Sequence, residues 1–367
     1  MKKTLLITMD FYPSIGGISR YYERLSDCMP ASDWAVLAPT LPVGVFEEAH
    51  PYAIYRKRFF SKFLWPRWLM LAYAIYRIVK KEQIRCILVG QVLPVGSAVW
   101  LVSFFTGIPY VVSLHGMDLG CAQKSYRKYT AASCVLKYAR KIVVNSSDTA
   151  HKAMQFGVGE QRIAYIYPCA DIPHTAFIER TGEHYPVLLT ISRLVQRKGI
   201  QYSIEAMPRV LQVFPTCRYI IAGGGQMMRE LNGLIQAKGL RDHVECIGII
   251  SDEAKDALYR ECDMFVMAPY EDNGDVEGFG MVYLEANSFG KPVIGTRSGG
   301  VPDAVVDGKT GILVEEKNSD TLAEAILRLA KDTTFAQRLG AQGCERVKQE
   351  FQWSVQAKKL EKILTYL

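Results

Sequence analysis

Residues 86–114 read CILVGQVLPVGSAVWLVSFFTGIPYVVSL, and the fold class of the chain depends on how this segment is interpreted. It contains no charged residue, so its length alone would allow a helix that crosses a bilayer. Pro94, Gly96, Gly107 and Pro109 divide it, however, into CILVG, VGSAVWLVSFFTG and IPYVVSL. Strands buried on both faces of a parallel sheet also form continuous apolar runs. We therefore favour a strand, a helix and a strand within a protein core over a membrane span.

The same alternation of apolar runs and helix-length amphipathic segments extends over the whole chain of 367 residues. Strand candidates are TLLITM, WAVLA, CILVG, PYVVSL and KIVVNS in the first half, and PVLLTIS, RYIIAGG, VECIG, MFVMAP, KPVIGT and TGILV in the second. Such alternation is typical of parallel sheets with crossover helices. It pauses at residues 167–185, which hold two prolines, and we place a hinge there. The sequence thus predicts an α/β protein with domains over residues 1–170 and 171–351, followed by a helix over residues 352–367.

The cysteine content and the amino-terminal sequence argue against a disulfide-rich, zinc-binding or secreted protein. The nine cysteines are scattered, odd in number and without a CxxC pair, which argues against a disulfide scaffold or a zinc site. A reducing, cytoplasmic location fits them best. The opening MKKTLLITMDFYPS looks like a signal peptide, but its apolar run is short and Asp10 follows at once. We expect a first strand there instead.

Positive charge is concentrated in the first half of the chain. Residues 1–171 carry a net charge of +10 and the remainder −3, which together give +7. Between Ala49 and Lys81 no residue is acidic, while basic and aromatic residues are interleaved. One interpretation is a solvated basic helix face over a core stripe; the other, which we favour, is a surface for anionic lipid headgroups. The residues assigned to that surface are Arg56, Lys57, Arg58, Lys62, Trp65, Arg67 and Trp68. We expect no nucleic-acid partner, because no recognition motif accompanies the charge.

Two motifs follow predicted strands in the first half. Gly16 and Gly17 open a helix, where free N–H groups and close backbone approach suit a phosphate, although a plain turn fits equally well. The pair is neither G-x-G-x-x-G nor a Walker loop, which argues against dehydrogenases and P-loop enzymes. His115 follows PYVVSL and precedes Gly116 and Asp118. This position is compatible with a ligand-site histidine and equally with a purely structural one.

The second half places two cations after a strand. Arg193 and Lys198 follow PVLLTIS on a loop that leads into a helix. Cations at this spacing suit a diphosphate, since hydrogen bonds between ionised groups are about twice as strong as neutral ones. Two surface cations near a turn are the alternative.

The densest patch of polar signals is APYEDNGDVEGFGMVYLEA, residues 268–286. Glu277 lies at a glycine-flanked junction before a helix, and the spacing to Glu285 matters only in that context, because E-x7-E recurs elsewhere in the chain. A carboxylate at Glu285 is placed to bind a vicinal diol such as a ribose. The amides expected to be unpaired at the helix start, and open to a phosphate or sugar hydroxyl, are those of Phe279, Gly280 and Met281.

The acidic residues of this patch have a second interpretation. Asp272, Asp275 and Glu277 form a cluster that a metal ion would suit. No histidine or second carboxylate set accompanies them, so we expect no metal. Residues 298–302, SGGVP, follow KPVIGT and indicate another turn that brings backbone close to the site.

Taken in order, GG, HGxD, SRLxxxKG, AGGG, EGFGMVYLEA and SGGVPD resemble family 4 of the retaining glycosyltransferases. That family has the GT-B fold, an α/β fold of two Rossmann-like domains with parallel sheets facing an interdomain cleft. The resemblance covers residues 5–351, and DVEGFGMVYLEA is most similar to bacterial phosphatidylinositol mannosyltransferases and related envelope enzymes. The chain departs from the family where Cys169-Ala170-Asp171 stands in place of an N-G-V-D turn, and in a longer, more acidic loop before Glu277.

The resemblance implies a role for each matching residue. Arg193 and Lys198 would hold the donor diphosphate, Glu277 the sugar hydroxyls and Glu285 the ribose, while His115 would line the sugar site. His115, Arg193, Lys198 and Glu277 would be the catalytic set. Further donor contacts would come from Gly16, Gly17, Gly223, Gly225, Phe279, Gly280 and Met281. The last helix would pack back on the first domain.

The function implied is retaining transfer of a hexose from a nucleoside-diphosphate sugar, GDP-mannose or a UDP-hexose, to a lipid-linked or cell-envelope glycan. No cofactor and no metal are expected. The expected partners are this donor, a glycan or glycolipid acceptor and an anionic membrane surface, which places the protein peripherally at the inner face of the cell membrane. The alternatives are a GT-B sugar-nucleotide epimerase or phosphorylase, and a non-catalytic glycan- or lipid-binding protein.

Overall fold

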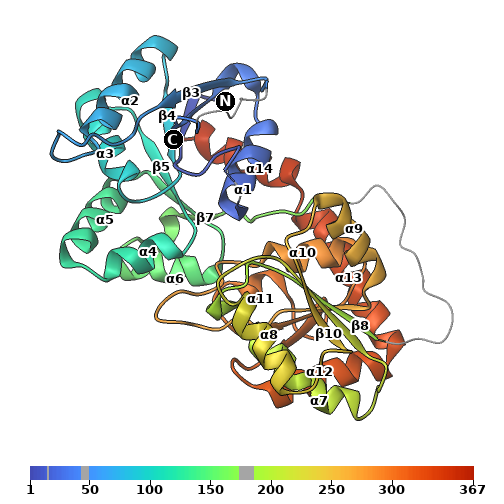
Figure 1. The fold of residues 1–367 in the computed structure, drawn as a ribbon. Coiled ribbons are helices and arrows are strands. Elements are labelled where there is room, and N and C mark those ends of the chain that lie inside the picture. Colours follow the sequence, from blue (N-terminus) through green and yellow to red (C-terminus); the bar gives the residue numbers. More distant parts are fainter. Residues whose placement is uncertain (15, 43–48, 173–185) are drawn as a thin grey trace. The chain divides into compact units, whose positions relative to one another are not determined.

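The computed structural model describes residues 1–14, 16–42, 49–172 and 186–367. It divides into two compact units (Figure 1). Unit 1 comprises Met1–Pro168 together with Trp353–Leu367, and unit 2 comprises Cys169–Gln352. Of the hinge predicted over residues 167–185, residues 173–185 lie outside the described residues.

Unit 1 is built on a parallel seven-stranded sheet in the order β3-β2-β1-β4-β5-β6-β7. Its central strands are apolar and buried because helices cover both faces of the sheet. The strands are β1 (Thr4–Ile7), β2 (Trp34–Pro39), β3 (Ala53–Lys57), β4 (Cys86–Val89), β5 (Tyr110–Leu114), β6 (Lys141–Val144) and β7 (Ile163–Tyr165). The helices are α1 (Gly17–Asp27), α2 (Leu69–Glu82), α3 (Val95–Thr106), α4 (Met117–Gln123), α5 (Tyr126–Tyr138), α6 (Ser147–Gln155) and α14 (Trp353–Thr365), with 3-10 turns η1 (Ala31–Asp33) and η2 (Glu160–Arg162).

Unit 2 is built on a parallel six-stranded sheet in the order β10-β9-β8-β11-β12-β13. Its strands are β8 (Val187–Ile191), β9 (Arg218–Ala222), β10 (Val244–Gly248), β11 (Met264–Val266), β12 (Val293–Thr296) and β13 (Gly311–Val314). Its helices are α7 (Ile200–Leu211), α8 (Met228–Ala237), α9 (Asp252–Glu261), α10 (Met281–Ser288), α11 (Val301–Ala304), α12 (Ser319–Lys331) and α13 (Thr333–Glu350), with the 3-10 turn η3 (Gln196–Lys198).

In both sheets the first strand in the sequence lies centrally, and the strand order runs outward from it in both directions. In unit 1, β1 lies between β2 and β4, and in unit 2, β8 lies between β9 and β11. This strand order is that of a Rossmann-like, doubly wound fold, in which ligands bind at the carboxyl ends of strands beside the point of reversal. The expectation of an α/β protein with two Rossmann-like domains is confirmed.

All eleven predicted strands are present, and residues 86–114 form β4, α3 and β5 as predicted. The structure adds the edge strands β3 and β7. β3 reads AIYRK and is largely exposed or half-buried, and β7 has three residues, so neither carries an apolar run. Within the described residues, no helix is both long enough and apolar enough to cross a membrane.

The last helix, α14, belongs to unit 1 and lies beside α1 (Figure 1). The rings of Tyr21 and Trp353 are 6.0 Å apart, edge to face. Buried Gln356 accepts a hydrogen bond of 3.1 Å from the amide of Tyr167. The end of the chain therefore packs on the helix that opens with the glycine pair.

Candidate donor site and histidine site

A buried cluster of charges lies in the loops that follow β8 and β11 of unit 2. Arg197 and Lys198 end η3, and both are buried. Arg197 Nη1 lies 2.7 Å, and Lys198 Nζ 2.5 Å, from the same atom, Oε2 of Glu277. Arg197 Nε also lies 3.1 Å from Oδ2 of Asp275. Two positive and two negative charges thus meet where a doubly wound fold binds its ligand.

The ionisation of this cluster depends on its internal pairing. Burial alone would raise the pKa of Glu277, but Lys198 and Arg197 outweigh burial and hold that pKa at about 2. Burial lowers the pKa of Lys198, and Glu277 opposes that shift. Glu277 is therefore ionised at neutral pH, and it favours the charged form of a buried ammonium group.

Arg193 is the exposed member of the predicted cation pair. It lies two residues after β8 and forms no ion pair or side-chain hydrogen bond within the described part of the chain. It is near enough to Lys198 to lower the pKa of that lysine. The structure thus brings the two predicted cations together, one paired and buried and the other available to an anion.

The glycine loop after β9 packs against the Arg193 loop. The amide of Leu194 donates to the carbonyl of Gly224 over 2.9 Å, and the amide of Met227 donates to the carbonyl of Leu194 over 3.0 Å. A Cβ atom at Gly223 would lie 1.8 Å from the carbonyl oxygen of Ser192, and one at Gly225 2.3 Å from that of Leu194. These glycines are needed for this backbone contact, whatever their part in nucleotide binding.

The junction before α10 offers free backbone donors. Gly280 precedes the helix with φ 91°, and a Cβ atom there would lie 2.6 Å from the ring of Tyr283, so only glycine fits. The amides of Gly280 and Met281 form no hydrogen bond within the described residues. Phe279 is buried, with its ring 5.8 Å from that of Phe351. The helix start is thus open to an anion or a sugar hydroxyl.

The turn of residues 298–300, SGG, contacts the backbone of Glu277. The amide of Gly300 donates to the carbonyl oxygen of Glu277 over 2.8 Å. Gly299 has φ 50°, and a Cβ atom there would lie 2.4 Å from the same oxygen. The turn predicted to approach the site therefore fixes the backbone of the central carboxylate.

Glu285 has partners different from those of Glu277. Its Oε2 accepts a hydrogen bond of 3.0 Å from the hydroxyl of Tyr259, and its Oε1 lies 3.9 Å from Nζ of Lys255. The side chain is half-buried on α10. These contacts orient a carboxylate with acceptor capacity left for a diol.

The acidic residues considered as a metal cluster are engaged in other ways. Asp275 and Glu277 pair with Arg197, and Asp272 and Asp275 exchange backbone hydrogen bonds of 3.0 and 2.9 Å. Across the described residues, no three histidine, cysteine, aspartate or glutamate side chains gather as metal ligands do. Two of the three carboxylates are therefore already paired with cations.

In unit 1, His115 follows β5 and is held by two tyrosines. Its Nε2 lies 2.7 Å from the hydroxyl of Tyr22, which donates to the carbonyl of Gly90 over 2.9 Å. A hydroxyl has one proton, so it accepts from His115, which fixes the imidazole with its proton on Nε2. Tyr21 and Tyr22 both meet the ring edge to face at 5.3 Å. Burial lowers the pKa of His115 to about 4, so the ring is neutral at pH 7.

Asp118, in the first turn of α4, completes this histidine site. Its Oδ1 accepts a hydrogen bond of 3.1 Å from the amide of Leu119, whereas its Oδ2 is buried without a hydrogen-bond partner in the described structure. Burial raises the pKa of this carboxyl to about 6. A buried, unsatisfied acceptor beside a neutral histidine is typical of a ligand site.

The glycine pair lies at the start of α1. Gly17 is the first helical residue, and Gly16 precedes it without a side-chain cap. A Cβ atom on Gly16 would meet nothing within 4 Å, so packing within the chain does not require glycine there. The open space and the uncapped helix start are compatible with a phosphate.

The predicted membrane surface is divided between exposed and packed residues. Phe63 and Trp65 are 97% and 86% exposed. Arg56, by contrast, donates to the carbonyl of Tyr12 over 2.5 Å, and Trp68 packs partly against the core. The exposed basic residues of the set are Lys57, Arg58, Lys62 and Arg67. Lys57 ends β3 and the other three lie between β3 and α2, so the set does not form one helix face.

Sequence reasoning missed Arg197 and Tyr22. Arg197 adjoins Lys198 on one short turn, but this adjacency did not indicate that both cations approach the same carboxylate, because Glu277 is 80 positions away from Arg197 in the chain. Tyr22 had no signal, because its partner His115 is 93 positions away in the chain. The topology alone brings α1 and the end of β5 together.

A model described as glycosyl transferases group 1 matches residues 171–346, and one described as glycosyltransferase family 4 matches residues 15–173. The chain is therefore a glycosyltransferase, and its two doubly wound units are the two domains of a GT-B fold. The chain belongs to glycosyltransferase family 4, and neither alternative function finds support.

Several relatives match the full length. The chain is 29% identical over 383 residues to the GDP-mannose-dependent monoacylated alpha-(1-6)-phosphatidylinositol monomannoside mannosyltransferase of Corynebacterium glutamicum, covering 99% of this chain and 98% of the relative. It is 29% identical over 387 residues to the GDP-mannose-dependent alpha-(1-6)-phosphatidylinositol monomannoside mannosyltransferase of Mycolicibacterium smegmatis, covering 98% of each.

Solved structures support the fold. Sucrose-phosphate synthase from Thermosynechococcus elongatus has a TM-score of 0.83 at 21% identity, covering 100% of this chain and 99% of that chain. Anabaena HepE in complex with UDP has a TM-score of 0.80 at 19% identity, covering 100% of both chains. At this level of identity the likeness concerns the fold alone.

Proposed function

We propose that this glycosyltransferase transfers mannose from GDP-mannose to a phosphatidylinositol mannoside or a similar lipid-linked glycan, with retention of configuration and without a metal ion. The observation that carries the proposal is the cluster of Arg193, Lys198 and Glu277 beside the open start of α10. The relatives above, similar over nearly their whole length, support the choice of donor and acceptor.

The reaction breaks the bond between the anomeric carbon and the diphosphate oxygen, and both electrons leave with the diphosphate. The acceptor hydroxyl oxygen bonds to the anomeric carbon on the same face, and its proton passes to the leaving phosphate oxygen. Negative charge therefore develops on the diphosphate. Preset cations and helix-start amides stabilise that charge in the transition state, as an oxyanion hole does.

Each residue has a defined task in this scheme. Arg193, exposed and unpaired within the described chain, binds the diphosphate, and Lys198 adds a buried positive charge. Glu277 keeps one carboxylate oxygen for sugar hydroxyls while the other holds two cations. His115, neutral with its proton on Nε2, offers Nδ1 as an acceptor to a sugar hydroxyl. Glu277 and Asp275 compensate two of the three cations in this cluster. The net positive charge comes from Arg193, which has no acidic partner among the described residues and takes the place of a divalent ion in the scheme.

The test is release of GDP from GDP-mannose with a phosphatidylinositol mannoside acceptor, in EDTA, with anomeric configuration of the product read by NMR. We expect turnover in EDTA equal to that with magnesium, and an α-linked product. UDP-glucose and UDP-galactose serve as competing donors. Exclusive use of a UDP-sugar would contradict GDP-mannose as the donor. Loss of turnover in EDTA would contradict a metal-free reaction, and a product of inverted configuration would contradict retention.

We also propose that the segment after β3 attaches the enzyme to anionic membranes. Phe63 and Trp65 are nearly fully exposed between basic residues, and each basic residue near such a membrane contributes about 1 kcal/mol. Vesicle flotation with rising phosphatidylglycerol content tests this. Trp65→Ala should reduce binding, whereas Tyr126→Ala, which removes an 85% exposed ring elsewhere in unit 1, should not. Binding that ignores lipid charge and salt would contradict the proposal.

A further inference from the structure

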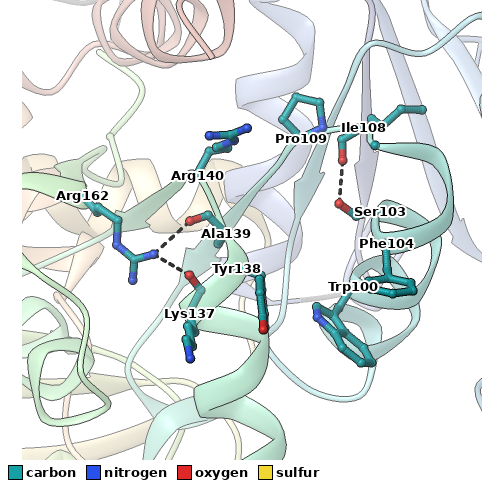
Figure 2. Close-up of a pocket in the computed structure, with 11 residues that line it drawn as sticks. Trp100, Ser103, Phe104, Ile108, Pro109, Lys137, Tyr138, Ala139, Arg140 and Arg162 are labelled. Atoms are coloured by element: carbon teal, nitrogen blue, oxygen red, sulfur yellow. Dashed lines mark hydrogen bonds between the residues drawn. The ribbon is translucent and has the colours of Figure 1, made fainter.

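A pocket of about 500 Å³ lies at the amino-terminal edge of the unit 1 sheet (Figure 2). It is lined by the ends of α3 and α5, by the turn of residues 107–109 before β5, and by Arg162 before β7. His115 follows the opposite, carboxyl end of β5. The pocket is therefore separate from the histidine site, and its volume is in the range of small-molecule sites, roughly 300–1,000 Å³.

Aromatic side chains form one side of the pocket. The ring of Trp100 lies 6.4 Å from the ring of Phe104 and 6.4 Å from that of Tyr138. Phe104 and its neighbour Phe105 are 74% and 75% exposed. The indole N–H of Trp100 donates no hydrogen bond to any described residue. The pocket thus combines an apolar surface with an unused donor.

Cations form the other side, and none of the lining residues is acidic (Figure 2). The fold itself explains Arg162, whose Nη1 donates to the carbonyls of Lys137 and Ala139 over 2.8 and 3.1 Å at the end of α5. It does not explain Arg140, which is exposed and has no ion pair or side-chain hydrogen bond in the described structure. Lys137 lies with Nζ 5.8 Å from the centre of the Tyr138 ring.

Arg140 also borders a second hollow, of about 570 Å³, at the same edge of the sheet. This hollow shares Pro109 and Arg140 with the first pocket and adds Lys2 and Arg85. Lys2 donates a hydrogen bond to the carbonyl of Leu367, whereas Arg85 forms no side-chain contact of that kind within the described residues. Positive charge therefore continues past the pocket, with Arg140 at the centre.

We propose that the aromatic–cationic pocket around Arg140 binds a phosphate ester whose apolar part lies on Trp100 and Phe104. Arg140 would bind the phosphate with two parallel N–H groups, and the Trp100 N–H would add a third donor. This site shares no residue with the donor site of unit 2, so the proposal does not depend on the proposed reaction.

The exposed rings beside the pocket favour a phospholipid headgroup over a free ester. Phe104 and Phe105 end α3, and α3 packs on α2, whose own carboxyl end carries Lys80 and Lys81. Exposed aromatic rings beside basic residues are typical of a surface that lies against lipid headgroups. A free phosphate ester shares the same chemistry, and the experiment separates the two sources.

The test is isothermal titration calorimetry of the full chain with three soluble probes: dihexanoylphosphatidylglycerol below its micelle concentration, sn-glycerol 3-phosphate, and dihexanoylglycerol, which lacks phosphate. We expect saturable binding of the phospholipid and none of dihexanoylglycerol. Arg140→Gln should weaken binding about tenfold or more, since it removes charge-assisted hydrogen bonds. Arg127→Gln, at the other end of α5 and likewise exposed and without a partner among the described residues, is the matched control.

Each outcome decides the matter. Tighter binding of phospholipid than of glycerol phosphate, with the difference lost in Phe104→Ala, supports the lipid source; equal binding of the two supports a free ester. Absence of saturable binding by either phosphate probe, or an equal effect of the Arg140 and Arg127 variants, overturns the proposal. Arg193→Ala, which weakens the donor site, should leave binding of the probes unchanged, whereas failure of the donor site would appear only in nucleotide binding.

Discussion

Replacing Glu277 by glutamine tests whether its carboxylate compensates the buried cations of unit 2. Oε2 of Glu277 faces both Arg197 and Lys198, and Lys198 is only 8% exposed. Glutamine keeps the shape but leaves two buried cations, of which Arg197 retains Asp275, whose side chain is 43% exposed, as a partner, and Lys198 loses its acidic partner. Removing one partner of a buried pair costs about 3–5 kcal/mol. Because Asp275 still compensates Arg197, we expect a loss of about 3 kcal/mol in the free energy of unfolding.

Differential scanning calorimetry measures this loss. In a domain the size of unit 2, 1 kcal/mol shifts Tm by about 2–4 °C, so Tm should fall by about 6–12 °C. Combining Glu277→Gln with Lys198→Met removes the uncompensated ammonium group and should restore part of the loss. A loss below about 1 kcal/mol in the single variant, or strictly additive losses in the double variant, would show that Glu277 does not compensate a buried Lys198 charge.

Three further predictions concern the same sites. Arg193→Ala should lower turnover at least tenfold, because losing one donor at a developing negative charge costs about 3 kcal/mol, yet it should leave Tm unchanged in calorimetry since the side chain is exposed. Burial lowers the pKa of His115 from 6.5 to about 4, so at this residue the unfolded chain binds more protons between these values and the folded state loses stability as pH falls. Burial raises the pKa of Asp118 to about 6, which acts in the opposite direction over much of this window, so urea titrations should show the wild type losing stability relative to His115→Gln as pH drops. Gly299→Ala should lower the free energy of unfolding by about 2 kcal/mol or more in chemical denaturation, because φ is 50° and the Cβ atom would lie 2.4 Å from the carbonyl oxygen of Glu277. Gly308→Ala is the control: φ is 71° but the space is open, so only the backbone strain should lower its stability.

The strands of the sheets were predictable because their burial makes them apolar. β4, α3 and β5 follow from one uncharged stretch, since glycine and proline punctuate it where the elements end. The edge strand β3 was not predictable, because AIYRK faces solvent over much of its surface and resembles the basic loop that follows. Edge strands in general lack the periodic signal that burial imposes.

The site was predictable where its residues are close in sequence. Arg193 and Lys198 follow one strand, and the free amides of Gly280 and Met281 follow from glycine before a helix. The dual role of Glu277, which pairs with Arg197 as well as Lys198, depends on two loops meeting in space. The tautomer of His115 likewise depends on Tyr22 from a distant helix. Spacing along the chain carries no record of such contacts.

The central claim is that unit 2 binds a sugar-nucleotide diphosphate with Arg193 and Lys198 and releases it without a metal. The most direct measurement is nucleoside-diphosphate release from GDP-mannose, UDP-glucose and ADP-glucose in EDTA, by the wild-type chain and Arg193→Ala, with Arg229→Ala as an exposed-arginine control in the same unit. Release from GDP-mannose that falls at least tenfold in Arg193→Ala and is unchanged in Arg229→Ala is the predicted result. Equal release by the Arg193 variant and the wild type, or release that appears only when magnesium replaces EDTA, would contradict the claim.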